Sequence, residues 1–494
     1  MTISNILTDK LKDPTLATDK SLVGNEWLAA SQSGKTFEVT NPATGEVIAV
    51  LPDVSKAEVT KAIDAAHSAQ KAWAKKTGKE RAAILRKLND LMVANADDLA
   101  TILTMEMGKP WPEARGEILY GASYVEWFAE EAKRVYGDTI PGHQADKRIM
   151  VIKQPIGVVG AITPWNFPNA MLARKVAPAL AVGCAMVSKP AAQTPLSALA
   201  LAILAERAGL PAGLFSVLTS TDAAMVGEEM CANDKVRKLT FTGSTNVGRI
   251  LMRQGADQIM KLGLELGGNA PFIVFDDADL DAAVEGAMIS KYRNAGQTCV
   301  CANRLYVQSG IYDAFAEKLA EKVKQLKVGD GFADGVTTGP LIDAKAVEKV
   351  KEHVADAVSK GAKVALGGEP SSAGDLFFEP TILTGVTTAM KVATEETFGP
   401  VAPLFKFETE EEVIELANST EFGLASYFYS KDIAKIFRVA EALEYGMVGV
   451  NTGLISTEVA PFGGIKQSGL GREGSKYGID DYTEIKYICL GGIA

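Results

Sequence analysis

The sequence predicts an α/β protein built on largely parallel sheets. Short apolar runs rich in β-branched residues alternate with amphipathic helical segments, which is the rhythm of parallel strands joined by helices. The chain has 494 residues, and domains of roughly 100–200 residues would give two to four units. Apolar residues make up 47% and charged residues 23%, which leaves ample material for buried sheets.

The first expected elements are helices. Ser55 and Glu58 form a capping-box pattern, and Val59 and Ile63 begin a series of apolar residues at helical spacing. A second helix is expected from about Lys79.

The expected strands follow in two groups. The first group is 157–163, 185–188, 238–241 and 272–275. The second group, after residue 300, is 304–307, 363–366, 402–407, 426–429 and 446–451. Two further β-like stretches, 148–154 and 482–490, lie outside this rhythm, so we expect an arm or a subunit-contact sheet there.

Charge and composition exclude several partner classes. The net charge of -10 argues against a nucleic acid or an anionic membrane as the main partner. Residues 1–20 lack a secretory pattern, and the longest apolar run, 176–187, is shorter than the roughly 20 residues of a spanning helix. Five cysteines fit a reducing compartment, so the cytoplasm is the expected location.

Cys299 lies in the small-residue segment 294–301, where a backbone amide could face whatever the sulfur attacks. A free thiol is only about 3% thiolate at neutral pH, so a nucleophile here needs a nearby cation such as Arg293, or an incoming cofactor ring. Taken alone, Cys299 could equally be a buried thiol, and its pairing with Cys301 could suggest a metal or redox site. We expect no metal, because no second ligand pair stands at ordinary spacing.

Two other segments carry candidate chemistry. Glu265 stands in an apolar, glycine-rich stretch just before an expected strand, where burial would raise its pKa and suit it to take a proton from water. The same residue could be a structural acid. The run 238–248 reads as a strand, a turn at Gly243 and Ser244, and a helix that could bind a phosphate or a cofactor ring.

Together these residues resemble the aldehyde dehydrogenase superfamily. The resemblance rests on seven motifs in register over about 300 residues: PWNFP (164–168), SKPAAQTP (188–195), FTGSTNVG (241–248), LELGGN (264–269), GQTC (296–299), EETFGP (395–400) and PFGG (461–464). It implies a Rossmann-like cofactor domain (1–137 and 156–267), an α/β catalytic domain (268–470) and a small β oligomerisation arm (138–155 and 471–494). Homotetramers, as dimers of dimers, are expected by the same resemblance.

The resemblance also implies a mechanism. Cys299 would attack the aldehyde carbon, Asn166 and the Cys299 backbone amide would hold the oxyanion, and Glu265 would activate the hydrolytic water.

A nicotinamide cofactor is implied as well. By resemblance Lys189 and Glu396 would bind its ribose hydroxyls, Trp165 and Ser244 would lie along the dinucleotide, and Phe398 would lie beside the nicotinamide. NAD-preferring members commonly have a Glu three residues after Lys189, where this chain has Ala192. Because that repulsive carboxylate is absent, we predict NADP⁺ as the cofactor and leave NAD⁺ open.

Longer matches at 293–307, 443–456 and 462–482 resemble the bacterial succinate-semialdehyde dehydrogenases, and with them a role in GABA degradation. In that subgroup two arginines and a serine bind the substrate carboxylate, and they correspond to Arg174, Arg293 and Ser456. Cys301 corresponds to a second cysteine that pairs with the nucleophile in some relatives.

Three alternatives stay open. Glutarate semialdehyde or a broader range of aldehydes could be the substrate. A thiol hydrolase or a CoA-acylating dehydrogenase would also use Cys299, although Glu265 favours water over CoA. A non-enzymatic relative would keep the fold without needing the set of Cys299, Glu265 and Asn166.

Overall fold

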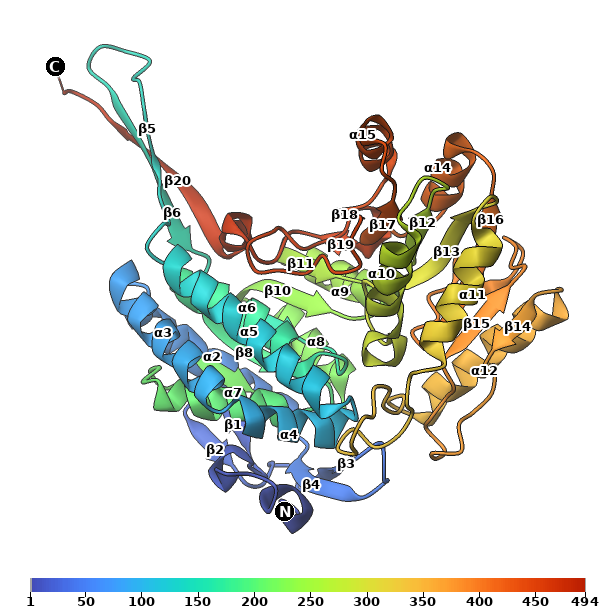
Figure 1. Ribbon diagram of the computed structural model, residues 1–494. Coiled ribbons are helices and arrows are strands. Elements are labelled where there is room, and N and C mark those ends of the chain that lie inside the picture. Colours follow the sequence, from blue (N-terminus) through green and yellow to red (C-terminus); the bar gives the residue numbers. More distant parts are fainter. Residues whose placement is uncertain (1, 494) are drawn as a thin grey trace.

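The computed structural model describes residues 2–493 and confirms the predicted α/β class. Two large sheets flanked by helices form the body, and a narrow three-stranded sheet projects from it with the C-terminus at its end (Figure 1). No helix in the described residues is long and apolar enough to cross a membrane.

The first sheet has eight strands in the order β19-β11-β10-β7-β8-β9-β1-β2. The central five strands are parallel, whereas β19, β1 and β2 pair in the antiparallel sense. Its strands are β1 (Ser21–Val23), β2 (Glu26–Leu28), β7 (Val158–Ile162), β8 (Ala185–Lys189), β9 (Phe215–Val217), β10 (Val236–Thr242), β11 (Lys261–Glu265) and β19 (Gly469–Leu470).

The helices around this sheet fall into two sets of mutual neighbours. One set is α2 (Lys56–Trp73), α8 (Ala223–Ala232) and α9 (Thr245–Ala256), and the other is α3 (Gly78–Ala94), α4 (Ala96–Met107), α5 (Trp111–Glu131), α6 (Pro168–Val182) and α7 (Leu196–Arg207). The predicted capping box is present, because the Glu58 carboxylate accepts the backbone N–H of Ser55 at 2.7 Å. The second predicted helix, α3, has the same device at Thr77 and Glu80.

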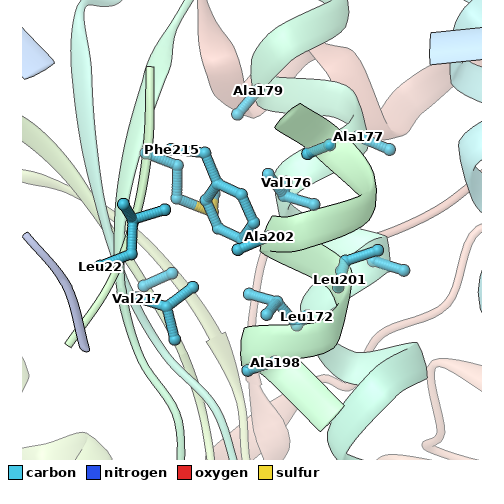
Figure 2. Close-up of a cluster of buried hydrophobic side chains, with 14 of the residues drawn as sticks. Leu22, Leu172, Val176, Ala177, Ala179, Ala198, Leu201, Ala202, Phe215 and Val217 are labelled. Carbon is cyan, nitrogen blue, oxygen red and sulfur yellow. The ribbon is translucent and has the colours of Figure 1, made fainter. Parts of the chain in front are cut away.

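Close packing of small apolar side chains joins helices to the sheet. Figure 2 shows Phe215 and Val217 of β9 on the side of α7 that carries Ala198 and Ala202. Leu201 lies on the other side of this helix, and all five side chains are buried. Burial of a large apolar side chain such as Phe215 stabilises the fold by about 1.5–3 kcal/mol relative to exposure. Packing in the same core holds α6, which begins at Pro168, the last residue of the motif at 164–168.

The second sheet has seven strands in the order β14-β15-β16-β13-β12-β17-β18, and only β14 is antiparallel. Its strands are β12 (Ala270–Val274), β13 (Ala302–Gln308), β14 (Lys363–Leu366), β15 (Thr381–Thr384), β16 (Val401–Phe407), β17 (Ala425–Tyr429) and β18 (Met447–Val450). Its helices are α10 (Leu280–Tyr292), α11 (Tyr312–Val323), α12 (Ala344–Ser359), α13 (Lys391–Thr394), α14 (Glu410–Asn418) and α15 (Ile433–Ala442).

Alternate residues of the central strand β12 enter two different cores. Phe272 and Val274 pack into one cluster, and Ile273 packs into the other. Because successive side chains of a strand point to opposite faces, both faces of the sheet are buried. A strand buried on both faces has a continuous apolar sequence, which is why this one could be predicted.

The projecting sheet consists of β5 (Asp138–Ile140), β6 (Arg148–Pro155) and β20 (Thr483–Leu490) (Figure 1). The predicted β-like stretches therefore pair with each other, in an antiparallel register from Arg148 with Leu490 to Pro155 with Thr483. Residues 469–482 instead lie against the first unit, since β19 pairs with β11 and Ile479 and Tyr482 enter its core. The division into 1–137 with 156–267, 268–470, and 138–155 with 471–494 stays our proposal.

Several elements were not predicted from the sequence. They are the hairpin β3 (Thr36–Thr40) and β4 (Val47–Pro52), the helices α1 (Asn5–Thr8), α4 and α5, the strands β1, β2, β5, β9, β11, β15 and β19, and the 3-10 turns η1 (Pro14–Leu16), η2 (Arg293–Gly296), η3 (Lys466–Ser468) and η4 (Lys476–Tyr482). Glu265 precedes the strand β12 as expected, and it is also the last residue of β11, a strand that we did not predict. β11 runs parallel to β10, and this pairing forms a strand in spite of Gly263 at its centre.

Candidate active site

A cavity of about 350 Å³ is lined by residues from both units. Asn166 and Ser244 reach it from the carboxyl ends of β7 and β10, where open α/β sheets usually bind ligands. Seven residues predicted for catalysis or cofactor binding line it: Trp165, Asn166, Gly243, Ser244, Cys299, Glu396 and Phe398. The structure therefore brings together side chains that are more than 230 positions apart in the sequence.

Cys299 follows a strained turn. Asn294, Ala295 and Gly296 all have positive φ (53°, 55° and 76°), a conformation that costs roughly 1–2 kcal/mol for each residue with a Cβ. Glu113 of α5 holds the turn, because its carboxylate accepts the backbone N–H of Asn294 at 2.9 Å. A Cβ at Gly296 would lie 2.2 Å from a backbone oxygen, so only glycine fits there.

The Cys299 thiol is half-buried at the wall of the cavity. Burial raises its pKa to about 12, and the positive charges of Arg174 and Arg293 oppose that rise. Arg293 was the cation that we expected beside the thiol. The structure adds Arg174 as a second one.

Asn166 occupies the position expected for an oxyanion donor. Its side-chain Nδ2 donates to the Gln297 carbonyl at 3.0 Å, and its Oδ1 is buried without a partner. Since a carboxamide carries two N–H groups, the second remains free to donate.

Glu265 is buried, and both of its carboxylate oxygens lack a hydrogen-bond partner. Burial and the nearby charge of Glu473 raise its pKa well above the ordinary value, against the opposing effect of Arg174 and Lys175. A carboxylate in this setting binds protons more tightly than usual, as a base for water should.

The guanidinium of Arg174 is already paired with a carboxylate of the protein, that of Glu473. Its side chain is 1% exposed, and its Nε donates to the Glu473 carboxylate at 2.6 Å. Lys175 binds the other oxygen of Glu473, and the guanidinium lies over the ring of Phe462 at 4.1 Å. Burial opposes ionisation of Glu473, but the two cations lower its pKa to about 2.

Ala192, the position at which NAD-preferring members commonly have a Glu, lies in a neighbouring cavity of about 180 Å³. Ala192 lines this cavity together with Gln193 and Glu38, and Ile342 is common to both cavities. Lys189 ends β8 nearby, and burial lowers its pKa to about 8 while Asp53 and Asp222 oppose this.

Glu396 and Phe398 lie on the segment before β16. Glu396 accepts the backbone N–H of Gly268 at 3.3 Å, and burial raises its pKa to about 7. The ring of Phe398 meets that of Trp165 edge to face at 5.5 Å, so the two rings form an apolar wall of the larger cavity.

Arg293 and Ser456 line a separate cavity of about 10 Å³, space for about one water molecule, together with Thr298, Val300 and Tyr427. Thr298 and Val300 flank the nucleophile, so this cavity adjoins the reactive turn. Arg174 is not among its lining residues. Two residues of the predicted carboxylate site, Arg293 and Ser456, therefore line one cavity. The third, Arg174, is instead ion-paired with Glu473.

Cys301 faces a different environment from Cys299. Its thiol is buried and donates to the carbonyl of Lys291 at 3.3 Å. Both cysteines are free thiols, and their pairing as a redox couple stays a prediction.

The site lies within a segment that matches a known protein family. The model of the aldehyde dehydrogenase family matches residues 27–488, which include every residue of the two cavities discussed for catalysis and cofactor. The chain belongs to the aldehyde dehydrogenase family.

Individual relatives in the family are close along their whole length. Glutarate-semialdehyde dehydrogenase of Pseudomonas aeruginosa is 66% identical over 484 residues, covering 98% of this chain and 100% of the relative. The NADP(+)-dependent succinate-semialdehyde dehydrogenase of Escherichia coli is 64% identical over 482 residues, covering 98% and 100%. The solved structure of a succinate-semialdehyde dehydrogenase from Burkholderia pseudomallei has a TM-score of 0.96 at 63% identity, covering 97% and 99%.

These findings confirm the predicted family, its fold and its class of enzyme, an aldehyde-oxidising dehydrogenase. The predicted cofactor, NADP⁺, agrees with the name of the E. coli relative. Relatives of similar identity are named for two semialdehydes that differ in length, glutarate semialdehyde and succinate semialdehyde.

Sequence reasoning missed several charged residues of this aldehyde dehydrogenase site. Lys109, Glu117 and Glu473 are buried around it, and Glu113 is half-buried. Glu113 and Glu117 lie in α5, Lys109 stands just before that helix, and Glu473 lies between β19 and η4. None of them is part of the seven family motifs, so no local pattern singled out these charged residues. Such a residue is seldom buried without a partner, but the partner's identity depends on the fold.

Proposed function

We propose that this enzyme oxidises succinate semialdehyde to succinate with NADP⁺, through a covalent intermediate on Cys299. The observation that carries the substrate class is the cavity in which Arg293 and Ser456 face the nucleophile's turn. A guanidinium and a hydroxyl can hold a carboxylate through paired hydrogen bonds. An aldehyde whose far end is a carboxylate would therefore present its carbonyl to Cys299.

The chemistry follows from the residues in the larger cavity. The Cys299 thiol gives its proton to water, and its sulfur forms a bond to the aldehyde carbon. The carbonyl electrons move to the oxygen, which Asn166 Nδ2 and the Cys299 backbone N–H stabilise. Beside this carbon a nicotinamide cofactor, when bound, would supply a hydride acceptor. Loss of the hydride would leave a thioester on Cys299.

Glu265 completes the cycle. It takes a proton from water as the water oxygen bonds to the thioester carbon, and the carbon–sulfur bond breaks to release the carboxylate. The unpartnered oxygens and raised pKa of Glu265 support this role.

The cavities fit a dinucleotide. The 12-residue helix α9 begins at Thr245, directly after its N-cap Ser244, and its first-turn N–H groups suit a pyrophosphate. Trp165 and Phe398 would lie against the nicotinamide end, Glu396 and Lys189 would bind ribose hydroxyls, and Ala192 would lie at the adenosine ribose.

Arg174 would contribute to the carboxylate site through its remaining Nη1, since its Nε and Nη2 face Glu473. The arm would join protomers into a tetramer. The exposed apolar surface of β20 supports this role of the arm, because Ile485 and Tyr487 are 73% and 59% exposed.

Glutarate semialdehyde is the second candidate substrate, favoured by the 66% identity to a relative named for it. The deciding experiment measures reduced-cofactor absorbance for succinate semialdehyde, glutarate semialdehyde and a neutral aldehyde of similar length, each with NADP⁺ and with NAD⁺. We expect the highest kcat/KM with succinate semialdehyde and NADP⁺. A higher kcat/KM for the neutral aldehyde would overturn the carboxylate site, and a higher value for glutarate semialdehyde would overturn the preferred chain length.

A further inference from the structure

Lys109 and Glu117 form a buried ion pair beside Asn166. Their side chains are 1% and 0% exposed, and Lys109 Nζ lies 2.6 Å from Glu117 Oε2. Lys109 stands between α4 and α5, and Glu117 lies in α5. The proposed chemistry uses neither residue.

The pair holds both sides of the turn that carries Asn166. Lys109 Nζ donates to the Asn166 backbone carbonyl at 2.8 Å. On the other side, Glu117 Oε1 accepts the backbone N–H groups of Asn169 and Ala170 at 3.0 and 3.2 Å, which are the first turn of α6. The ammonium also lies 3.7 Å from the centre of the Phe167 ring.

Asn166 is thereby fixed at its backbone while its side chain faces the nucleophile's turn. Its carbonyl accepts a second hydrogen bond, from Asn294 Nδ2 at 3.1 Å, and its own Nδ2 donates to Gln297 at 3.0 Å. The direction of the side-chain amide depends on the peptide plane that Lys109 holds. A misplacement of about 1 Å in such a group can cost about 100-fold in rate.

Stability alone does not account for this pair. Removing two charges from water is costly, and apolar residues of similar volume are often as stable or more stable in such positions. Helix α6 needs only an acceptor at its first turn, which a neutral Gln at position 117 would also provide.

From this geometry we propose that Lys109, neutralised by Glu117, is a positioning residue that orients the Asn166 amide toward the oxyanion. It acts through Asn166 and does not touch the substrate. The inference rests on the proposed role of Asn166 as an oxyanion donor.

The test is a double-mutant cycle on the full-length enzyme. The variant Lys109→Met/Glu117→Gln removes both charges, keeps the volume and leaves the Gln oxygen for α6, so no buried charge is stranded. This double variant is made in the enzyme that keeps Asn166 and again in the Asn166→Ala enzyme. For each protein, kcat, KM for the aldehyde, KM for the cofactor and Tm are measured. Lys238→Met, which removes another lysine with a 1% exposed side chain, beside Asp481, is the matched control.

We expect the double variant to lower kcat by about 10- to 100-fold when Asn166 is present and by less than about threefold in Asn166→Ala. KM for the cofactor stays within about twofold, and Lys238→Met changes Tm but not kcat. Equal losses of kcat in the two backgrounds, or no loss in either, would overturn the positioning role. If Asn166→Ala alone leaves kcat unchanged, the proposed oxyanion role fails, and the positioning role fails with it.

Discussion

Arg174 Nε donates to Glu473 Oε2 at 2.6 Å, joining two residues 299 positions apart inside the protein. Lys175 binds the same carboxylate, so one acid neutralises two adjacent cations of α6. Glu265 lies within the electrostatic reach of all three groups, and its pKa responds to each of them.

The first prediction concerns Glu473. In Glu473→Gln the negative charge that raises the pKa of Glu265 is gone, while Arg174 and Lys175 remain positive and lower it. In a plot of kcat against pH, the rise in kcat that follows ionisation of Glu265 therefore moves to lower pH. We expect a loss of about 3–5 kcal/mol in stability as well, because a buried pair has lost one partner. A profile that moves to higher pH would contradict this; Glu410→Gln, far from the site on α14, is the control.

The second prediction concerns Asn166. Asn166→Ala should lower kcat on the order of 100–1000-fold, as the loss of an oxyanion donor typically does. Cofactor binding, followed by fluorescence titration, should be retained because the backbone contacts of residue 166 remain. An unchanged kcat would remove this residue from the mechanism.

The third prediction compares the two arginines. Arg293→Ala should raise KM for succinate semialdehyde much more than KM for a neutral aldehyde of similar length, with little change in Tm. Arg174→Ala should also lower Tm, because it leaves Glu473 with only Lys175. If Arg293→Ala affected both aldehydes equally, the carboxylate site would be refuted.

The fourth prediction concerns cofactor choice. Ala192 lines the 180 Å³ cavity without a charge of its own, although Glu38 and Glu106 line it too. A 2′-phosphate would therefore meet no carboxylate at position 192 itself. Ala192→Glu should shift kcat/KM toward NAD⁺ by at least about tenfold, or roughly 1.4 kcal/mol of transition-state preference. Ala192→Gln, of similar size but uncharged, separates charge repulsion from bulk.

The fifth prediction concerns pH and Glu396. Burial raises the pKa of this carboxyl to about 7, so it is mainly protonated below that pH and ionised above it. An ionised carboxylate is the better acceptor for ribose hydroxyls. Cofactor Kd should therefore fall as pH rises from about 6 to about 8, and Glu396→Gln should flatten that dependence. A Kd that rises with pH in the native enzyme would contradict the assignment.

Local patterns in the sequence determined much of the fold. Continuous apolar runs predicted the central strands of both sheets, because strands covered on both faces need apolar residues at every position. Short or edge strands such as β1 and β9 escaped prediction, since three residues carry no usable periodicity and their strand conformation comes from pairing with a neighbour.

The sequence also determined the identity of the reactive groups. The motifs around Cys299, Glu265 and Asn166 were enough to predict a family and a covalent mechanism. Tertiary structure alone decided how these groups are charged and held: Arg174 is bound to Glu473, and Lys109 binds the backbone of Asn166. Burial and electrostatic partners depend on the distances between residues that are remote in the chain, and no local pattern encodes those distances.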